Sequence, residues 1–246
     1  MLETRELTLR IGGATIVDGV SFGVPEGLFV SIIGPNGAGK TSLFNLLSGI
    51  YRPTRGQVFF QGADITRLPP HRRVRLGLGR SFQLTTIFPG LSTLENARLA
   101  AQAARPGNLA LWRGALRDRV AIERAERALE IVGLRGREAV PAGSLAHGDK
   151  RKLELALLLC TDPTVLLLDE PTAGVSAEEV PAMLAAIRRI RRVEGKTILM
   201  VEHKMDVVHD LSDRVAVLAN GALVAYDAPD AVMADPFVRS AYLGVT

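Results

Sequence analysis

The chain of 246 residues contains a single cysteine, Cys160. One thiol cannot form a disulfide within the chain, which is consistent with a protein of a reducing cytosol. Cys160 ends the apolar run Leu155–Leu159, where a cysteine behaves as a small hydrophobic residue. We therefore expect a buried core thiol at this position.

The sequence also lacks a long hydrophobic segment, a signal-like N-terminus and a run of basic residues. No stretch of about 18 uncharged apolar residues occurs, so no segment is expected to cross a bilayer. Charges within residues 1–5 stand where a secretory signal would be apolar. The formal net charge of +4 suits anionic ligands, but without a run of five Lys or Arg residues it does not indicate nucleic acid. Any association with a membrane would then depend on a partner protein.

The most informative motif that is present is Gly34–Thr41, which fits the pattern G-x-x-x-x-G-K-[ST]. Its glycines let successive backbone N–H groups point at an anion, while Lys40 adds charge beside the β- and γ-phosphates and Thr41 can bind Mg²⁺. Residues 28–33 predict a buried strand before the loop, and residues 41–48 predict a helix after it. This context favours a nucleotide site over an ordinary glycine-rich turn. The residues assigned to nucleotide binding here are Gly34, Pro35, Asn36, Gly37, Ala38, Gly39, Lys40, Thr41 and Ser42.

Alternating apolar and polar residues predict antiparallel strands over 5–33. Asn220-Gly221 lies between two apolar strands and predicts a hairpin with a type I′ turn. Capping-box spacing predicts that helices begin at Ser92–Glu95 and at Ser176–Glu179, the second running to about Val193. Helical periodicity also marks residues 109–132.

Strands that end in phosphate-binding or acidic residues alternate with helices, which predicts an α/β fold with a parallel-sheet core. We expect a P-loop NTPase with an N-terminal antiparallel β subdomain and an inserted helical subdomain. The chain is predicted to be one domain, 1–246. Within it, about 1–90 and 161–246 form the nucleotide-binding core, and about 91–160 form the helical subdomain.

Acidic and polar residues follow three further strand-like segments. Asp169 and Glu170 end the apolar run 164–168, where an acid is costly unless a cation or hydrogen bonds pair it. Because neighbouring side chains of an extended segment point in opposite directions, Asp169 can hold Mg²⁺ while Glu170 faces the attacking water as base. Two surface acids without a function are the alternative. His203 follows an apolar strand in the same way, and Gln83 follows a shorter one.

The order of these motifs resembles the nucleotide-binding subunits of ABC transporters along nearly the whole chain. The matching segments are Gly34–Thr41 (Walker A), Gln83 (Q-loop), Leu145–Asp149 (signature), Val165–Asp169 (Walker B), Glu170 (catalytic glutamate), Ala173–Ser176 (D-loop) and His203 (switch histidine).

The resemblance implies a head-to-tail dimer, in which each ATP lies between the Walker A loop of one subunit and the signature of the other. Residues 145–149 precede a predicted helix, so their amides can face a γ-phosphate. It also implies that Glu170, His203 and Gln83 are catalytic, and that Thr41, Gln83 and Asp169 serve Mg²⁺. The signature residues that would contact nucleotide are Leu145, Ala146, His147, Gly148 and Asp149.

Several segments are similar to the larger ATP-binding subunit of branched-chain amino acid importers. They are Gly79–Gln83 with Ile87–Ser92, the insert after Ala100, the Leu-Ala-His-Gly-Asp signature, Val201–Asp206 and the ending from Asp235 to Gly244. This similarity implies an ATPase on the cytoplasmic face of the inner membrane. Its partners would be permease subunits, a second similar ATP-binding subunit and, indirectly, a solute-binding protein.

Alternative functions remain at this stage. Urea and short-amide importers share much of the pattern, and lipopolysaccharide-export ATPases are close in length but typically lack the long insert. A soluble P-loop kinase would need a second substrate site and no signature motif. Soluble ABC proteins that act on DNA or ribosomes usually carry coiled-coil or tandem-domain insertions, which this chain lacks.

Three departures from the family pattern concern nucleotide contacts. Ile11 aligns with the aromatic residue that stacks on adenine, and isoleucine can pack on a base but has no π system. Ala146 and His147 replace the usual Ser and Gly of the signature. The D-loop segment Ala173–Ser176 lacks its usual Asp.

Overall fold

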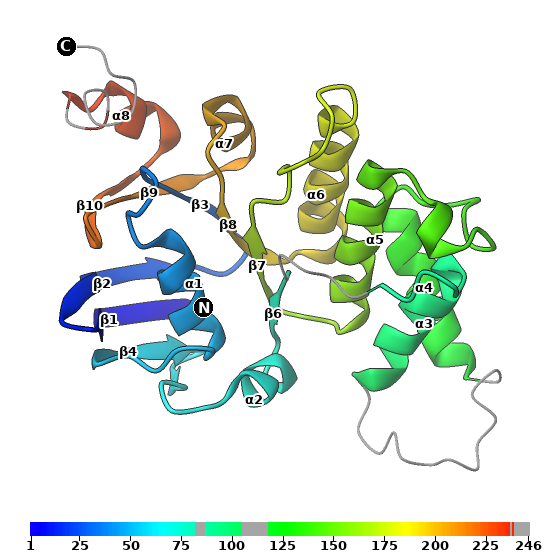
Figure 1. Ribbon diagram of the computed structural model, residues 1–246, viewed down its shortest axis with the longest axis horizontal. Coiled ribbons are helices and arrows are strands. Elements are labelled where there is room, and N and C mark those ends of the chain that lie inside the picture. The colour runs from blue at the N-terminus through cyan, green and yellow to red at the C-terminus, as the bar shows by residue number, and fades with distance from the viewer. Residues whose placement is uncertain (82–86, 105–117, 237, 239–246) are drawn as a thin grey trace.

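The structure, a computed structural model, describes residues 1–81, 87–104, 118–236 and 238. Its strands form a six-stranded sheet, in the order β10-β9-β3-β8-β7-β6, and a four-stranded sheet, in the order β2-β1-β4-β5. Helices α3, α4 and α5 lie together at one end of the molecule, and strands β1, β2 and β4 lie at the other (Figure 1). The described part of the chain contains no helix that is long and apolar enough to cross a membrane.

The six-stranded sheet is the parallel core that the sequence predicts. Strands β3, β6, β7, β8 and β9 are parallel, and only the edge strand β10 is antiparallel to its neighbour. Every residue of β3, β7 and β8 is buried, because helices and the second sheet cover both faces. The bounds are β3 Phe29–Ile33, β6 Leu78–Arg80, β7 Val165–Asp169, β8 Thr197–Val201, β9 Arg214–Ala219 and β10 Ala222–Asp227.

The helices pack on opposite faces of this sheet. Helix α1 contributes Leu43, Phe44 and Leu47 to a core cluster with alternate residues of β3 and β8, while α4, α5 and α6 share a cluster with the other alternates. The division into a core and an inserted helical subdomain stays a prediction. The helices are α1 Lys40–Ser48, α2 Pro70–Arg75, α3 Thr93–Ala103, α4 Arg119–Ile131, α5 His147–Cys160, α6 Val180–Glu194, α7 Met205–Leu211 and α8 Pro229–Ala234, with a 3₁₀ turn at Ala142–Ser144.

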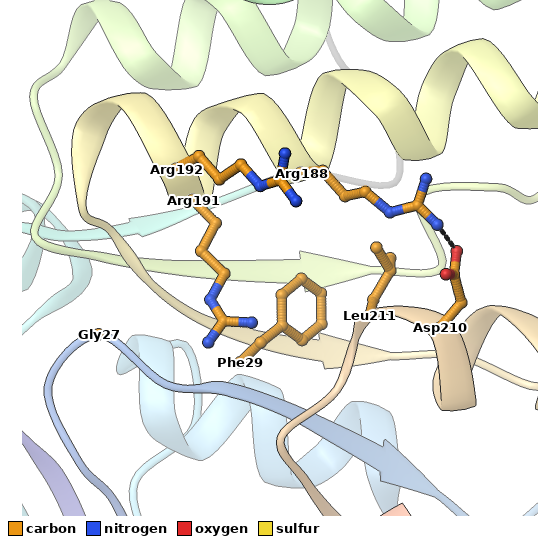
Figure 2. Close-up of a pocket in the computed structure, with 7 residues that line it drawn as sticks. All are labelled: Gly27, Phe29, Arg188, Arg191, Arg192, Asp210 and Leu211. Atoms are coloured by element: carbon orange, nitrogen blue, oxygen red, sulfur yellow. Dashed lines mark hydrogen bonds and ion pairs between the residues drawn. The ribbon is translucent and has the colours of Figure 1, made fainter.

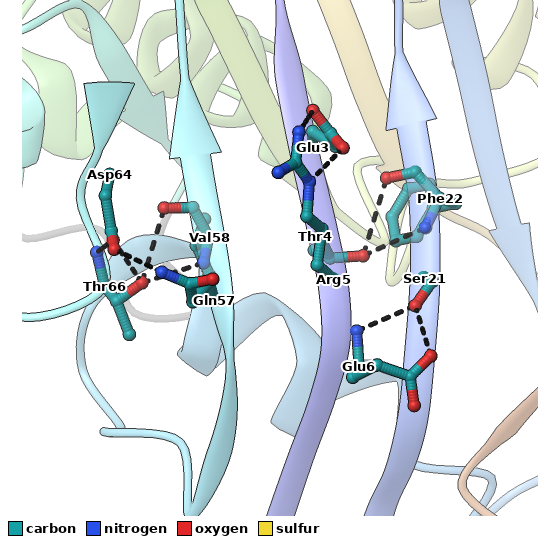
Figure 3. Close-up of polar contacts among 10 residues, drawn as sticks. All are labelled: Glu3, Thr4, Arg5, Glu6, Ser21, Phe22, Gln57, Val58, Asp64 and Thr66. Atoms are coloured by element: carbon teal, nitrogen blue, oxygen red, sulfur yellow. Dashed lines mark hydrogen bonds and ion pairs between the residues drawn. The ribbon is translucent and has the colours of Figure 1, made fainter. Parts of the chain in front are cut away.

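The antiparallel sheet contains β1 Leu2–Ile11, β2 Ala14–Val24, β4 Arg55–Phe60 and β5 Ala63–Asp64. A bulge interrupts the pairing of β1 and β2, and Glu6 there has a φ of 48°. Figure 3 shows side chains that replace the lost ladder hydrogen bonds: the Phe22 amide donates to Thr4 Oγ1 over 3.1 Å, and the Glu6 amide donates to Ser21 Oγ over 2.7 Å. The predicted antiparallel pairing therefore holds as far as Val24.

Three local predictions are tested directly by the structure. The prediction of antiparallel pairing is wrong for residues 29–33, because this strand pairs in parallel with β8 and β9. The hairpin at Asn220-Gly221 is confirmed, with φ values of 48° and 82° that fit a type I′ turn. Cys160 is fully buried as expected, and burial raises the pKa of its thiol to about 12.

One capping-box prediction is right and the other is wrong. Ser92 precedes α3, and its side chain accepts a hydrogen bond from the Glu95 amide, as predicted. Helix α6, however, begins at Val180 rather than at Ser176. Pro181 is the reason, because its ring is tolerated only in the first turn of a helix, which places the helix start directly before it. Ser176 and Glu179 therefore do not form a capping box, and their side chains bond to each other instead.

A buried arginine, Arg73, fixes the end of α1 through hydrogen bonds to backbone carbonyls. Arg73 is 1% exposed and donates to the carbonyl oxygens of Leu46 and Leu47, both over 2.7 Å, and to those of Thr66 and Leu68. The first two carbonyls belong to the last turn of α1, which needs donors from outside the helix. Desolvation lowers the pKa of Arg73 to about 10. Helix α2 thus anchors the helix that begins with Lys40.

Candidate active site

The phosphate-loop motif lies between β3 and α1. Helix α1 begins at Lys40, and the residue before it, Gly39, has a φ of 97° in the left-handed region. A Cβ atom at Gly39 would lie 2.6 Å from the carbonyl oxygen of Ile16, so only glycine fits. Thr41 is exposed at the start of the helix, and Ser42 is half-buried. The predicted strand, loop and helix are confirmed as structure.

The Lys40 ammonium is folded into its own loop. Its Nζ atom donates to the carbonyl oxygens of Gly34, over 2.6 Å, and Pro35, over 3.0 Å. Desolvation lowers the pKa of Lys40, and the negative charges of Glu170 and Asp169 oppose that shift. The loop lysine and the two acids at the end of β7 therefore lie within electrostatic reach of one another.

Asp169 ends β7 with a side chain that is 1% exposed. Its Oδ2 atom accepts a hydrogen bond from Arg80 Nη2 over 3.1 Å, and its backbone amide donates to Ser81 Oγ over 3.1 Å. Its Oδ1 atom is buried without a hydrogen-bond partner among the described residues. Desolvation raises the pKa of Asp169, and Arg80 counteracts that rise. A buried carboxylate oxygen without a donor is suited to a cation.

Arg80 is a site residue that the sequence reasoning missed. It ends β6 and donates through Nη1 to Asn45 Oδ1 over 2.6 Å and to Ser48 Oγ over 2.9 Å, while Nη2 reaches Asp169. Its guanidinium also lies over the Phe44 ring, 5.7 Å from the centroid. It therefore links α1 to the acid of β7. The sequence does contain a signal for this role. Arg80 is a charged residue at the end of a strand-like segment, where, like Asp169, it needs a partner.

Glu170 and His203 contact each other directly. Glu170 Oε1 lies 2.7 Å from His203 Nε2, and both side chains are roughly one-third exposed, at 35% and 38%. Glu170 has a φ of 47°, in the left-handed region that costs a residue with a side chain free energy. Its amide donates to Val201 O over 3.0 Å and holds this turn. Asp169 and Glu170 have different partners, Arg80 and His203, but Glu170 is not in the extended conformation that was predicted for it.

A third acid beside the site, Glu202, was not foreseen. Glu202 follows β8, is 3% exposed, and accepts a hydrogen bond from Thr172 Oγ1 over 2.7 Å. Desolvation raises the pKa of Glu202, which the bond from Thr172 opposes. Thr172 lies two residues beyond Glu170, so this buried bond connects the segment after β7 to the segment after β8 that carries His203.

The signature residues lie at the N-terminus of α5. The prediction that residues 145–149 all precede the helix is wrong, because α5 begins at His147 and only Leu145 and Ala146 come before it. Ala146 occupies the N-cap position and has no side chain that could cap the helix. Gly148 is buried, and its amide donates to Glu179 Oε1 over 3.3 Å. Asp149 accepts a hydrogen bond from Lys152.

Two predicted residues stand apart from this group. Ile11 lies at the end of β1 in the turn toward β2 and is 51% exposed. Gln83 lies outside the described residues. Roles for both stay predictions.

A pocket of about 400 Å³ lies elsewhere and shares no residue with the motifs (Figure 2). Arg188, Arg191 and Arg192 line it from α6, but Arg188 pairs with Asp210, and Arg191 pairs with Asp213 over 2.6 Å. Two of its three positive charges are therefore already compensated by carboxylates. The pocket does not compete with the phosphate-loop region as a candidate active site.

Comparison with known proteins places this arrangement in a family. Residues 17–173 match the family model described as ABC transporter. The chain belongs to the ABC transporter family. It is 39% identical over 251 residues to the high-affinity branched-chain amino acid transport ATP-binding protein BraF of Pseudomonas aeruginosa, covering 99% of this chain and 98% of that protein. It is 36% identical over 252 residues to LivG of Escherichia coli, with the same coverage.

The fold of this ABC chain is also that of solved cassettes. The ADP conformation of MJ1267, an ATP-binding cassette of an ABC transporter, matches with a TM-score of 0.87 and 29% identity, covering 100% of this chain and 99% of that one. The α/β fold with a parallel core is thereby confirmed. The chain is an ATP-binding and ATP-hydrolysing subunit of a membrane transport complex.

Proposed function

We propose that this chain is the ATPase subunit of an ABC importer for branched-chain amino acids. The observation that supports the ATPase chemistry is the gathering of Lys40, Asp169 and the Glu170–His203 pair at the carboxyl ends of the neighbouring strands β3, β7 and β8. Open α/β sheets bind their ligands at that edge. The solute is proposed from the names of the relatives BraF and LivG, which match along nearly their whole length.

Each residue has a proposed part in hydrolysis. The amides of Gly34–Thr41 and the Lys40 ammonium would bind the β- and γ-phosphates, which requires Nζ to leave its two carbonyl partners. Glu170 would accept a proton from the attacking water, and His203, bonded to its Oε1, would hold that carboxylate in place. Gln83 would sense the γ-phosphate together with His203. Ile11 would lie against the adenine.

Thr41 and Asp169 fit a magnesium site, with Gln83 as a third candidate. The buried Oδ1 of Asp169 has no donor among the described residues, which is the state expected of an oxygen that serves a cation. Mg²⁺ bound there would neutralise charge on the phosphates. Arg80 holds the other carboxylate oxygen and so orients the first.

The proposed partners follow from the family. The signature residues Leu145–Asp149 would contact nucleotide held by a second ATP-binding subunit, and permease subunits would anchor the pair at the cytoplasmic face of the inner membrane. A solute-binding protein would act indirectly through the permease. This arrangement would make ATP hydrolysis by one chain dependent on its neighbour.

Uptake by the reconstituted complex tests the proposal. The subunit is combined in liposomes with the membrane subunits that copurify with it, and ATP-dependent uptake of labelled leucine, urea and acetamide is compared. We expect leucine uptake that stops with Glu170→Gln and persists with Glu178→Gln, an exposed acid nearby. Uptake of urea alone would reassign the solute to the urea and short-amide class. Export of a lipopolysaccharide without uptake of any of these solutes would show that the complex is an exporter and not an importer.

A further inference from the structure

A carboxylate from a distant loop occupies the N-terminus of the signature helix. Glu179 Oε1 accepts the hydrogen bond of the Gly148 amide over 3.3 Å, and Glu179 Oε2 accepts one from Ser176 Oγ over 3.0 Å. The two carboxylate oxygens are thus held by different elements. A Cβ built on Gly148 would lie 2.6 Å from Oε1, so the carboxylate lies directly over this residue.

The contact is not explained by the helix to which Glu179 belongs. Glu179 is the N-cap residue of α6, yet its side chain makes no capping hydrogen bond to that helix. It reaches α5 instead, whose own N-cap residue, Ala146, cannot supply an acceptor. The first turn of α5 has amides that need acceptors and a positive end of the helix dipole, and Glu179 provides the negative charge.

We propose that Glu179 occupies, in the separate subunit, the position that the γ-phosphate of a neighbouring subunit's ATP takes in the assembled pair. This inference rests on the proposed function, because it takes the signature to be a phosphate contact between subunits. Both ligands are anions and both would use the Gly148 amide, so they cannot be bound together. Glu179 is therefore an internal competitor that ATP-driven pairing has to displace.

Ser176 determines how readily that displacement occurs. Its hydroxyl holds Oε2, and its carbonyl oxygen accepts the Glu179 amide over 3.0 Å, so the segment 176–179 forms a closed turn around the carboxylate. Glu178, the neighbouring acid, is exposed and makes no hydrogen bond among the described residues. It carries the same charge without the contact, which makes it a matched control.

The test measures ATP-driven pairing in a background that cannot turn over. The full chain with Glu170→Gln is compared with the same chain carrying Glu179→Ala, Glu179→Gln, Ser176→Ala or Glu178→Ala, by sedimentation velocity over a dilution series with Mg-ATP and without nucleotide. We expect Glu179→Ala to pair roughly 3- to 10-fold more tightly, from the loss of one anion at a helix N-terminus. Ser176→Ala should give a smaller increase, and Glu178→Ala should pair as the background does.

Hydrogen exchange of the Gly148 amide in the nucleotide-free subunit gives a second readout. We expect slow exchange in the parent chain, faster exchange with Glu179→Ala, and no change with Glu178→Ala. The competition is overturned if the Glu179→Ala chain pairs no more tightly than the background does. It is also overturned if the Gly148 amide of the parent chain is not protected from exchange. A third outcome is that no variant forms a subunit pair in the presence of ATP, although Glu179 protects the Gly148 amide from exchange. That result would overturn the shared site of the proposed function, and the competition with it.

Discussion

The two halves of the proposed site are held in the fold by different means. On the phosphate-loop side, Lys40 and Asp169 are buried at the ends of strands or helices of the core, and several hydrogen bonds fix each. On the signature side, Ala146, His147 and Ser176 are exposed, and one carboxylate, that of Glu179, joins the two loops. The first half is built into the core of the subunit, while the second is a surface whose geometry depends on what covers it.

The largest expected effect tests the chemistry on the core side. Glu170→Gln should keep nucleotide affinity within about two-fold but lower the ATPase rate by at least 10²-fold, because general bases contribute roughly 10²–10⁴ and an amide accepts no proton from water. The amide can still bond to His203, so the local structure should persist. Steady-state ATPase rates and binding of a fluorescent nucleotide measure the two parts. A variant that hydrolyses ATP at the parent rate would remove Glu170 as the base.

The next effect concerns the anchor of α1. Arg73→Met removes the side-chain donor from four carbonyl oxygens, two of them in buried hydrogen bonds at the end of α1, and we expect a loss of about 3–5 kcal/mol in the free energy of unfolding. The exposed neighbour Arg72 is the matched control, and Arg72→Met should change stability by less than about 0.5 kcal/mol. Urea denaturation of both variants is the measurement. Equal stabilities would show that water or other donors replace Arg73.

The core side and Arg73 also show how much of the structure could be predicted from the sequence. Lys40 and Asp169 were predictable from local patterns. A glycine-rich loop between a strand and a helix indicates a phosphate site, and an acid at the end of an apolar strand requires a cation or hydrogen bonds. The N-cap of α6 was predicted three residues too early, at Ser176 instead of Glu179, because Ser176 and Glu179 have capping-box spacing but Pro181 decides where the helix begins. Arg73 was not singled out, since its partners are backbone carbonyls that leave no mark in the sequence.

A smaller effect, and one that depends on pH, is expected at Arg80. Arg80→Met removes the guanidinium that opposes the upward pKa shift of Asp169, so the folded-state pKa of this acid should rise further above its unfolded value. A raised carboxyl pKa favours the folded state when the group is protonated and disfavours it when ionised. The variant should therefore lose about 2–3 kcal/mol at pH 7 and less at pH 4.

The measurement is urea denaturation of the nucleotide-free chain in a chelator, at both pH values. Arg98→Met provides the comparison, because Arg98 is also buried and pairs with Glu95, an acid that retains 32% exposure. We expect its cost to depend less on pH than that of Arg80→Met. A cost at Arg80 that is equal at pH 4 and pH 7 would show that its role is packing against Phe44 and α1 rather than support of the Asp169 charge.

The smallest effect lies at the exposed edge and sharpens the contrast between the two sides. Ile11 is 51% exposed at the end of β1, so a larger side chain there meets no crowding from the core. Ile11→Tyr supplies a π face, and stacking of a base on an aromatic ring contributes roughly 1–3 kcal/mol in other nucleotide complexes. Partial exposure should reduce that to a several-fold gain in ATP affinity with little change in affinity for tripolyphosphate, which has no base. Ile50→Tyr, at another exposed isoleucine, is the control for a general surface effect. Equal affinities for ATP in the parent and Ile11→Tyr chains would show that the adenine does not lie against β1, whereas a gain shared by tripolyphosphate would place the effect on the loop rather than on the base.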